Sequence, residues 1–227
     1  METLNACIKG NMVKALIGIN ALLLVAIVAL KNAPKENSDP APRATVPRVQ
    51  PAAAVDPQAL RARLQLHARS GLSYARKNRL STNVAFLIDM SRHSGSKRFF
   101  IYDLGADSLL ASGLVAHGSC NQDFLEDAVF SRIPDCGCSA IGRYKVGYSY
   151  AGQFGTAFKL HGLDSSNRTA FERFIVLHAY DCVPDREIAP EYLCNSRGCP
   201  MVSPEFLKTA SAYIRREKKP ILLWIYN

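Results

Sequence analysis

The chain has 227 residues, of which 48% are hydrophobic and 21% charged, with 28 Lys plus Arg against 19 Asp plus Glu and seven cysteines. This composition suits one or two domains with a buried core, and it excludes a disordered chain and a membrane protein with many spans. The net charge of +9 lies mainly in the N-terminal part: residues 1–54 contribute +3, residues 56–80 contribute +5 and residues 81–227 only +1. Because a nucleic-acid-binding domain needs a basic folded surface, we expect no nucleic acid as a partner.

The N-terminal segment is apolar over residues 12–30, and Asn20 is its one strongly polar residue after Ala15. As a helix it would be about 28 Å long, close to the thickness of a bilayer core. Lys9 and Lys14 precede the uncharged part, which is typical of an N-terminus that stays in the cytoplasm while the rest is exported. No clear Ala-x-Ala site follows, so residues 1–30 are predicted to be a membrane anchor in preference to a cleaved signal peptide.

Two segments connect this part to the rest of the chain. Residues 31–55 are rich in Pro, Ala and charge without hydrophobic periodicity, and we expect a semi-extended linker. Residues 56–80 are predicted to form a basic amphipathic helix, with Asp56 as N-cap and Pro57 at the first helical position. Its basic side chains form a solvated face or contact an anionic lipid or wall polymer.

Residues 81–227 show short β-prone runs separated by turn signals, with one further helix near the end. The predicted strands cover Asn83–Met90, Arg98–Asp103, Ser108–Ala116, Gly142–Tyr150, Ala157–Leu160, Phe174–Leu177 and Ile221–Tyr226, and the predicted helix covers Pro204–Arg216. The expected fold class is therefore mainly β, of the α+β type, with few helices.

A cysteine in a tight turn is the strongest chemical signal. Cys199 lies between a glycine and a proline, so its thiol is not in a typical packing position. Gly198 allows close backbone approach, the adjacent N–H groups can face an oxyanion, and Arg197 supplies a positive field that favours thiolate. His178 ends an apolar run and supplies a base, so Cys199 is predicted to be a nucleophile.

These motifs resemble those of the YkuD-type L,D-transpeptidases, in which a histidine is followed, after a stretch of this length, by a Ser/Thr-x-Gly-Cys turn. Residues 82–226 are similar in particular to the branch called murein L,D-transpeptidase catalytic domain. The segments that carry the similarity are Arg98–Leu104, Val115–Ser119, Arg173–His178 and Ser196–Pro200. Arg197 takes the place of a histidine found in the best-known members, and Ala179 that of a frequent glycine.

The resemblance implies a YkuD-like β-sandwich and acyl transfer on peptidoglycan stem peptides, with no cofactor and no metal. His178 would take the thiol proton, Cys199 would attack the carbonyl before the terminal D-residue, and a thioester acyl-enzyme would form. The amine of a neighbouring stem would then resolve the thioester to give a 3→3 cross-link. Ser196, Arg197 and Gly198 would shape the turn and its oxyanion hole.

Other expectations and alternatives follow from the same resemblance. His117 and Gly118 are candidates for lining the cleft. An L,D-carboxypeptidase or another thiol hydrolase on the same substrate remains an alternative, as does a non-catalytic cell-wall-binding module. The expected location is the bacterial cell envelope, with a catalytic domain in the periplasm that is anchored to the inner membrane through residues 12–30 or released if the signal is cleaved.

The remaining cysteines are candidates for disulfides, since an exported domain lies where these bonds form. Cys182 and Cys194 are the first expected pair, and Cys120 with Cys136 or Cys138 is the second. The alternative of a zinc site is disfavoured, because the spacings match no common pattern of zinc ligands.

Overall fold

The computed structural model describes residues 56–227, which form eight strands and two helices. The anchor or signal expected at residues 1–30 and the linker expected at residues 31–55 lie outside the described residues. Within residues 56–227, no helix is both long enough and apolar enough to cross a membrane. The mainly β class expected from the sequence is confirmed.

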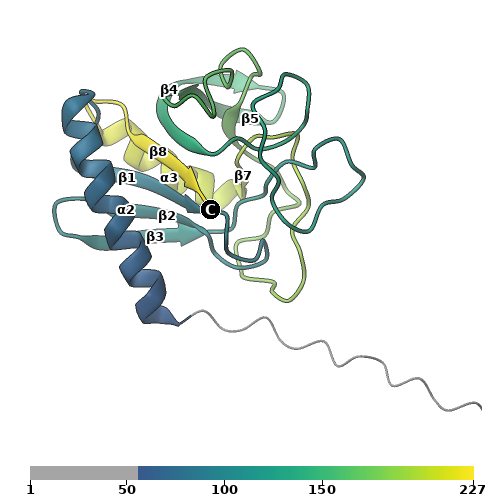
Figure 1. Ribbon diagram of the computed structural model, residues 1–227, viewed down its shortest axis with the longest axis horizontal. Helices are drawn as coiled ribbons and strands as arrows, with labels where there is room; N and C mark the ends of the chain where they lie inside the picture. The colour runs from purple at the N-terminus through teal and green to yellow at the C-terminus, as the bar shows by residue number, and fades with distance from the viewer. Residues whose placement is uncertain (1–55) are drawn as a thin grey trace, which may run out of the picture. The chain divides into compact units, whose positions relative to one another are not determined.

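The strands form one sheet (Figure 1). The elements are α2 Pro57–Lys77, β1 Val84–Asp89, β2 Phe99–Asp103, β3 Ser108–Gly113, β4 Gly142–Gly152, β5 Gly155–Gly162, β6 Val176–Ala179, β7 Met201–Val202, α3 Pro204–Arg216 and β8 Leu222–Tyr226. The strand order is β3-β2-β1-β8-β4-β5-β6-β7. The β1–β8 and β6–β7 pairs are parallel, and the other neighbours are antiparallel.

The predicted elements agree with these bounds except near the candidate site. Seven strands and the C-terminal helix were expected, and each is present within a few residues of its expected position. β6 begins at Val176 instead of Phe174, because Phe174 has a φ of 56° that no strand accommodates. β7 was not predicted, since two residues after a proline carry no periodic signal.

The expected β-sandwich is corrected in one respect, because the strands belong to one hydrogen-bonded sheet instead of two. The end of this sheet returns toward its start: Ala116, just after β3, forms an isolated bridge with Met201 of β7. The register shifts between Val146 and Ser149 where β4 pairs with β5. A bulge of this kind bends a strand and increases its twist, which lets one sheet curl round a core.

The first strands bury both faces, which explains their continuous hydrophobic runs. On one face, Phe86 and Ile101 pack into a large core together with Phe206 of α3. On the other face, Leu87 and Phe100 pack against α2. The two helices therefore cover opposite faces of this part of the sheet.

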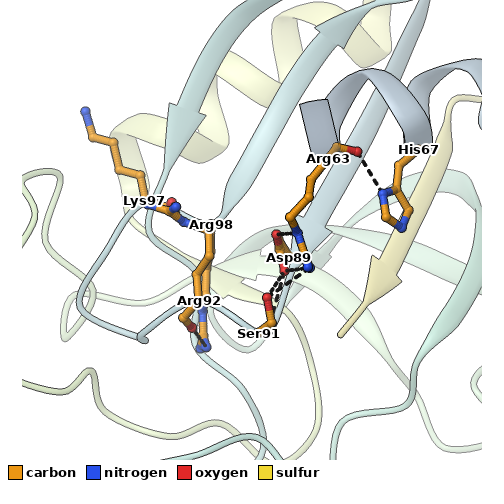
Figure 2. A network of polar contacts seen from close by, with 7 residues as sticks. All are labelled: Arg63, His67, Asp89, Ser91, Arg92, Lys97 and Arg98. Atoms are coloured by element: carbon orange, nitrogen blue, oxygen red, sulfur yellow. Dashed lines mark hydrogen bonds and ion pairs between the residues drawn. The ribbon is translucent and has the colours of Figure 1, made fainter. Parts of the chain in front are cut away.

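Helix α2 is fixed to the sheet by a partly buried ion pair, in which Asp89 is buried and the Arg63 side chain is 42% exposed (Figure 2). Asp89, the last residue of β1, is 1% exposed and accepts hydrogen bonds from Arg63 Nε and Nη2 at 3.0 and 2.9 Å. Ser91 Oγ donates to the same carboxylate at 2.6 Å. One of the basic residues of this helix therefore has a structural role, and it joins α2 to the end of β1.

We expect Arg63→Met to destabilise the protein by about 1–3 kcal/mol, because the buried carboxylate of Asp89 loses its charged donor. Urea unfolding followed by circular dichroism measures this change.

Arg69→Met is the matched control. Arg69 Nη2 lies 3.7 Å from Asp107 Oδ2, and the two side chains are 76% and 37% exposed. Such a pair contributes less than about 1 kcal/mol. Equal losses in the two variants would contradict a special role for the Arg63–Asp89 pair in docking α2.

Candidate active site

The β6–β7 pair brings the two predicted reactive residues together. His178 on β6 lies in register with Met201 on β7, and Cys199 is two residues before Met201. The backbone N–H of Val176 donates to Cys199 Sγ at 3.5 Å. Residues that are distant in the sequence therefore meet at one end of the sheet.

His178 and Cys199 line the same pocket, which has a volume of about 250 Å³. The residues lining it are Phe154, His178, Tyr180, Asn195, Ser196, Arg197, Cys199 and Met201. None of these lining residues is acidic, and Arg197 contributes an exposed positive charge. The pocket combines aromatic walls with a thiol and an imidazole, and its charge suits an anionic ligand.

The tautomer of His178 follows from its hydrogen bond. Its Nδ1 lies 3.0 Å from the carbonyl oxygen of Ala179, which can only accept, so Nδ1 carries the proton. Nε2 is then the basic nitrogen. The ring stacks on Phe154 with centroids 5.3 Å apart, and burial lowers the pKa of His178 more than the Ala179 carbonyl raises it. His178 is therefore a neutral imidazole whose Nε2 can accept a proton.

The thiol of Cys199 is also held in its neutral form. Burial raises its pKa, and this effect exceeds the opposing effects of the Val176 N–H and the positive charges of Arg173 and Lys159. Its Sγ lies 3.8 Å from the carbonyl oxygen of Phe174. A neutral thiol beside a neutral imidazole is suited to general-base activation at the moment of attack, in contrast to a preformed thiolate.

The turn before Cys199 is shaped by Ser196 and Gly198. The Ser196 hydroxyl donates to the carbonyl oxygen of Cys199 at 2.7 Å and accepts from the N–H of Gly198 at 3.1 Å. Gly198 has a φ of 106°, and a Cβ there would lie 2.6 Å from the carbonyl oxygen of Cys138. Gly198 is thus required by both conformation and space. Since its N–H is engaged within the turn, the amides of Arg197 and Cys199 are the candidate oxyanion donors.

His117 and Gly118 lie behind this turn and are not among the residues that line the pocket. Arg98 donates to His117 Nδ1 at 2.9 Å, and His117 Nε2 lies 3.1 Å from the carbonyl oxygen of Leu125. Burial, and then the charge of Arg98, lowers the pKa of His117 to about 4. His117 is therefore a neutral, fully bonded core residue.

Gly118 and Asn195 hold neighbouring segments against the nucleophile turn. A Cβ on Gly118 would lie 2.8 Å from the Cα of Gly198, so the two backbones are in close contact. The side-chain amide of Asn195 both accepts from the Leu125 N–H at 2.6 Å and donates to the Leu125 carbonyl oxygen at 2.9 Å. Gly118 therefore supports the turn from outside the pocket, whereas Asn195 lines the pocket and also holds the Leu125 segment.

Two disulfides are present, Cys182–Cys194 and Cys120–Cys138. The first is the pair expected from the sequence, and the second selects one of the two partners left open for Cys120. Cys136 and Cys199 are the free cysteines among the described residues. Within residues 56–227, no group of three or more His, Cys, Asp or Glu side chains has an arrangement that would hold a metal ion.

Four pocket residues were not anticipated from the sequence: Phe154, Tyr180, Asn195 and Met201. Phe154 lies in the turn between β4 and β5, where an exposed aromatic side chain was an available signal. Tyr180 and Met201 enter the pocket only through the β6–β7 pairing, which the sequence did not reveal.

The comparison with protein families agrees with this geometry. The model described as L,D-transpeptidase catalytic domain matches residues 53–226, including α2 and the whole sheet. The chain therefore belongs to this family, and the resemblance drawn from the sequence is confirmed. A search of curated proteins found no match.

Among the solved structures to which the chain is similar are three proteins. An L,D-transpeptidase from Mycobacterium smegmatis is 11% identical with a TM-score of 0.38, and the match covers 64% of this chain and 59% of that one. The helical cell shape determining protein Pgp2 from Campylobacter jejuni is 14% identical with a TM-score of 0.40, covering 63% and 47%. An L,D-transpeptidase from Xylanimonas cellulosilytica is 11% identical with a TM-score of 0.34, covering 63% and 60%. This chain thus spans 47–60% of the length of these three proteins.

The pKa directions predict how the thiol responds to pH. Because burial raises the pKa of Cys199, its alkylation by iodoacetamide should keep rising above about pH 8.5, where an ordinary thiol is half ionised. Peptide mapping of Cys199 over pH 6–10 measures the rate at this residue alone.

His178→Ala provides the control. A neutral imidazole does not stabilise a thiolate, so this variant should give the same pH profile as the wild type. An alkylation rate that is already maximal at pH 7 in the wild type, and falls in His178→Ala, would show a preformed thiolate–imidazolium pair instead.

Proposed function

We propose that the protein forms 3→3 cross-links in peptidoglycan by cysteine-dependent acyl transfer between stem peptides. The observation that carries this proposal is the joint placement of Cys199 and His178 in one pocket, with the basic Nε2 of the imidazole left free. Membership of the L,D-transpeptidase catalytic domain family supports the substrate class.

The acylation step begins with proton transfer. His178 Nε2 takes the proton of Cys199 Sγ as the sulfur attacks the carbonyl carbon that precedes the terminal D-residue. The tetrahedral intermediate carries an oxyanion, to which the N–H groups of Arg197 and Cys199 donate. His178 then gives the proton to the leaving nitrogen, the C–N bond breaks, and a thioester remains on Cys199.

The second step returns the enzyme to its starting state. The amine of a neighbouring stem attacks the thioester, and His178 accepts the proton that this amine loses. The C–S bond breaks, an amide cross-link forms, and the proton returns to the Cys199 sulfur. Water in place of the amine would give a shortened stem without a cross-link, which is the hydrolase outcome.

We also propose that the catalytic domain works in the cell envelope, tethered by an anchor at residues 12–30. The two disulfides support an oxidising compartment outside the cytoplasm. The apolar segment preceded by Lys9 and Lys14 supports export with the N-terminus inside.

Acylation by a carbapenem tests the reactivity of the thiol. The wild type is expected to gain the mass of one carbapenem, because its β-lactam carbonyl is an activated acyl donor. Cys136→Ser, which removes the other free thiol of the described residues, should gain the same mass, and Cys199→Ser should gain none. His178→Ala should react about 10²–10⁴-fold more slowly, since it lacks the base. Intact-protein mass spectrometry is the measurement, and a wild type that stays unmodified would favour a non-catalytic binding module.

Muropeptide profiles test the reaction itself. Expression in a bacterium that lacks its own L,D-transpeptidases should produce new 3→3 cross-linked muropeptides, detected by digestion and mass spectrometry. Cys199→Ser, at equal abundance, should produce none. Shortened stems without cross-links would exclude the transferase and identify a hydrolase.

A further inference from the structure

Lys159 on β5 is a cation with a largely buried side chain, close to the candidate active site. It is 9% exposed and lies opposite Val176 of β6 in the antiparallel register. Its neighbours Phe158 and Leu160 point into the large core, so the lysine points to the other face of the sheet. This is also the face of His178, two residues beyond Val176 on β6.

The ammonium of Lys159 has aromatic neighbours but no anionic partner. Its Nζ lies 4.6 Å from the ring centroid of Phe174, 5.3 Å from that of Tyr150 and 5.4 Å from that of Phe171. Within residues 56–227 it makes no ion pair. The Nζ atom itself reaches solvent, so the ammonium is open to an anion, while the cation–π contacts hold it beside the aromatic rings.

Phe174 connects this cation to the nucleophile. Its ring lies over the Lys159 ammonium, and its carbonyl oxygen lies 3.8 Å from Cys199 Sγ. The residue has a φ of 56°, a strained conformation for a bulky side chain, and it is 73% exposed. Phe174 thus lies between the thiol and the ammonium, and the charge of Lys159 acts on Cys199.

We propose that Lys159 binds the terminal carboxylate of the donor stem peptide. This inference rests on the proposed function. When Cys199 attacks the carbonyl before the terminal D-residue, the carboxylate lies one residue further along the stem, within about 4 Å of the attacked carbon. The ammonium of Lys159, which contacts Phe174 beside the thiol and has no anionic partner among residues 56–227, supplies a counter-ion. Lys159 is therefore a specificity-determining residue that selects stems with a free terminal carboxylate.

A substrate comparison tests this proposal. Lys159→Met keeps the length and apolar contacts of the side chain within the aromatic rings and removes the charge. For a donor tetrapeptide with a free terminal carboxylate, kcat/KM should fall about 10- to 100-fold, mainly through KM, because a charge-assisted hydrogen bond is lost. For the same peptide with a terminal amide, wild type and variant should differ less than about threefold. Release of the terminal residue, followed by mass spectrometry, measures both.

Two variants serve as controls. Lys145→Met removes a lysine from the neighbouring strand β4. The charges of Lys145 and Lys159 both lower the pKa of His161, but of these two lysines only Lys159 lowers the pKa of Cys199. Lys145→Met should leave both substrates unaffected. Lys159→Arg keeps the positive charge and should retain most of the discrimination between carboxylate and amide.

The outcomes separate this proposal from the proposed function. A loss in Lys159→Met that is equal for carboxylate and amide would overturn carboxylate binding, since a change in thiol reactivity alone affects both substrates equally. Carboxylate binding by Lys159 would also be overturned if the wild type lost kcat/KM on amidation of an internal carboxyl group and not of the terminal one. The same holds if Arg197→Met, and not Lys159→Met, removed the discrimination between terminal carboxylate and terminal amide. A wild type that neither turns over the peptides nor reacts with a carbapenem would contradict the proposed function itself.

Discussion

The parallel pairing of β6 with β7 is the interaction on which the candidate site depends. This pairing fixes the position of Cys199 along the strand direction relative to His178. Met201 lies in register with His178, and Cys199 is two residues before Met201. A strand of two residues has little stability of its own, so its neighbours determine its position. Ala116 donates to the carbonyl oxygen of Met201 at 2.8 Å, and the Cys182–Cys194 disulfide closes the connection between the two strands. The curvature of the sheet, which brings Ala116 to β7, therefore helps to position Cys199.

Around the nucleophile, the fold relies on backbones that approach each other closely. Gly118 and Gly198 are in contact, and Gly198 also lies against the carbonyl oxygen of Cys138. Arg173 donates to that same oxygen at 2.6 Å, and the disulfide to Cys120 fixes the Cys138 segment. A larger side chain at either glycine would displace one of these segments. The segments of Gly118 and Cys138, which do not line the pocket, thus position the turn that carries the Cys199 thiol.

The sequence predicted what depends on local pattern and missed what depends on distant partners. The hydrophobic runs of β1 and β2, the N-cap of α2 and the Gly-Cys turn are local features and were all recognised. Lys159 was overlooked because a lysine within a strand is normally solvent-facing, and its burial arises from rings far apart in the chain. His117 resembled a cleft residue for the same reason: its neutral, bonded state depends on Arg98, which only the fold brings to it.

The electrostatics of the pocket favour activation of the thiol during attack, before any thiolate accumulates. Burial raises the pKa of Cys199 and lowers that of His178, so proton transfer between them is unfavourable at rest. The charges of Arg173 and Lys159 work in the other direction. A carboxylate bound to Lys159 would cancel one of these two charges and make a resting thiolate less favourable still. Substrate binding would then make the acylation rate depend more strongly on His178 as the base. The site would stabilise the oxyanion, which forms only during attack, in preference to a resting thiolate.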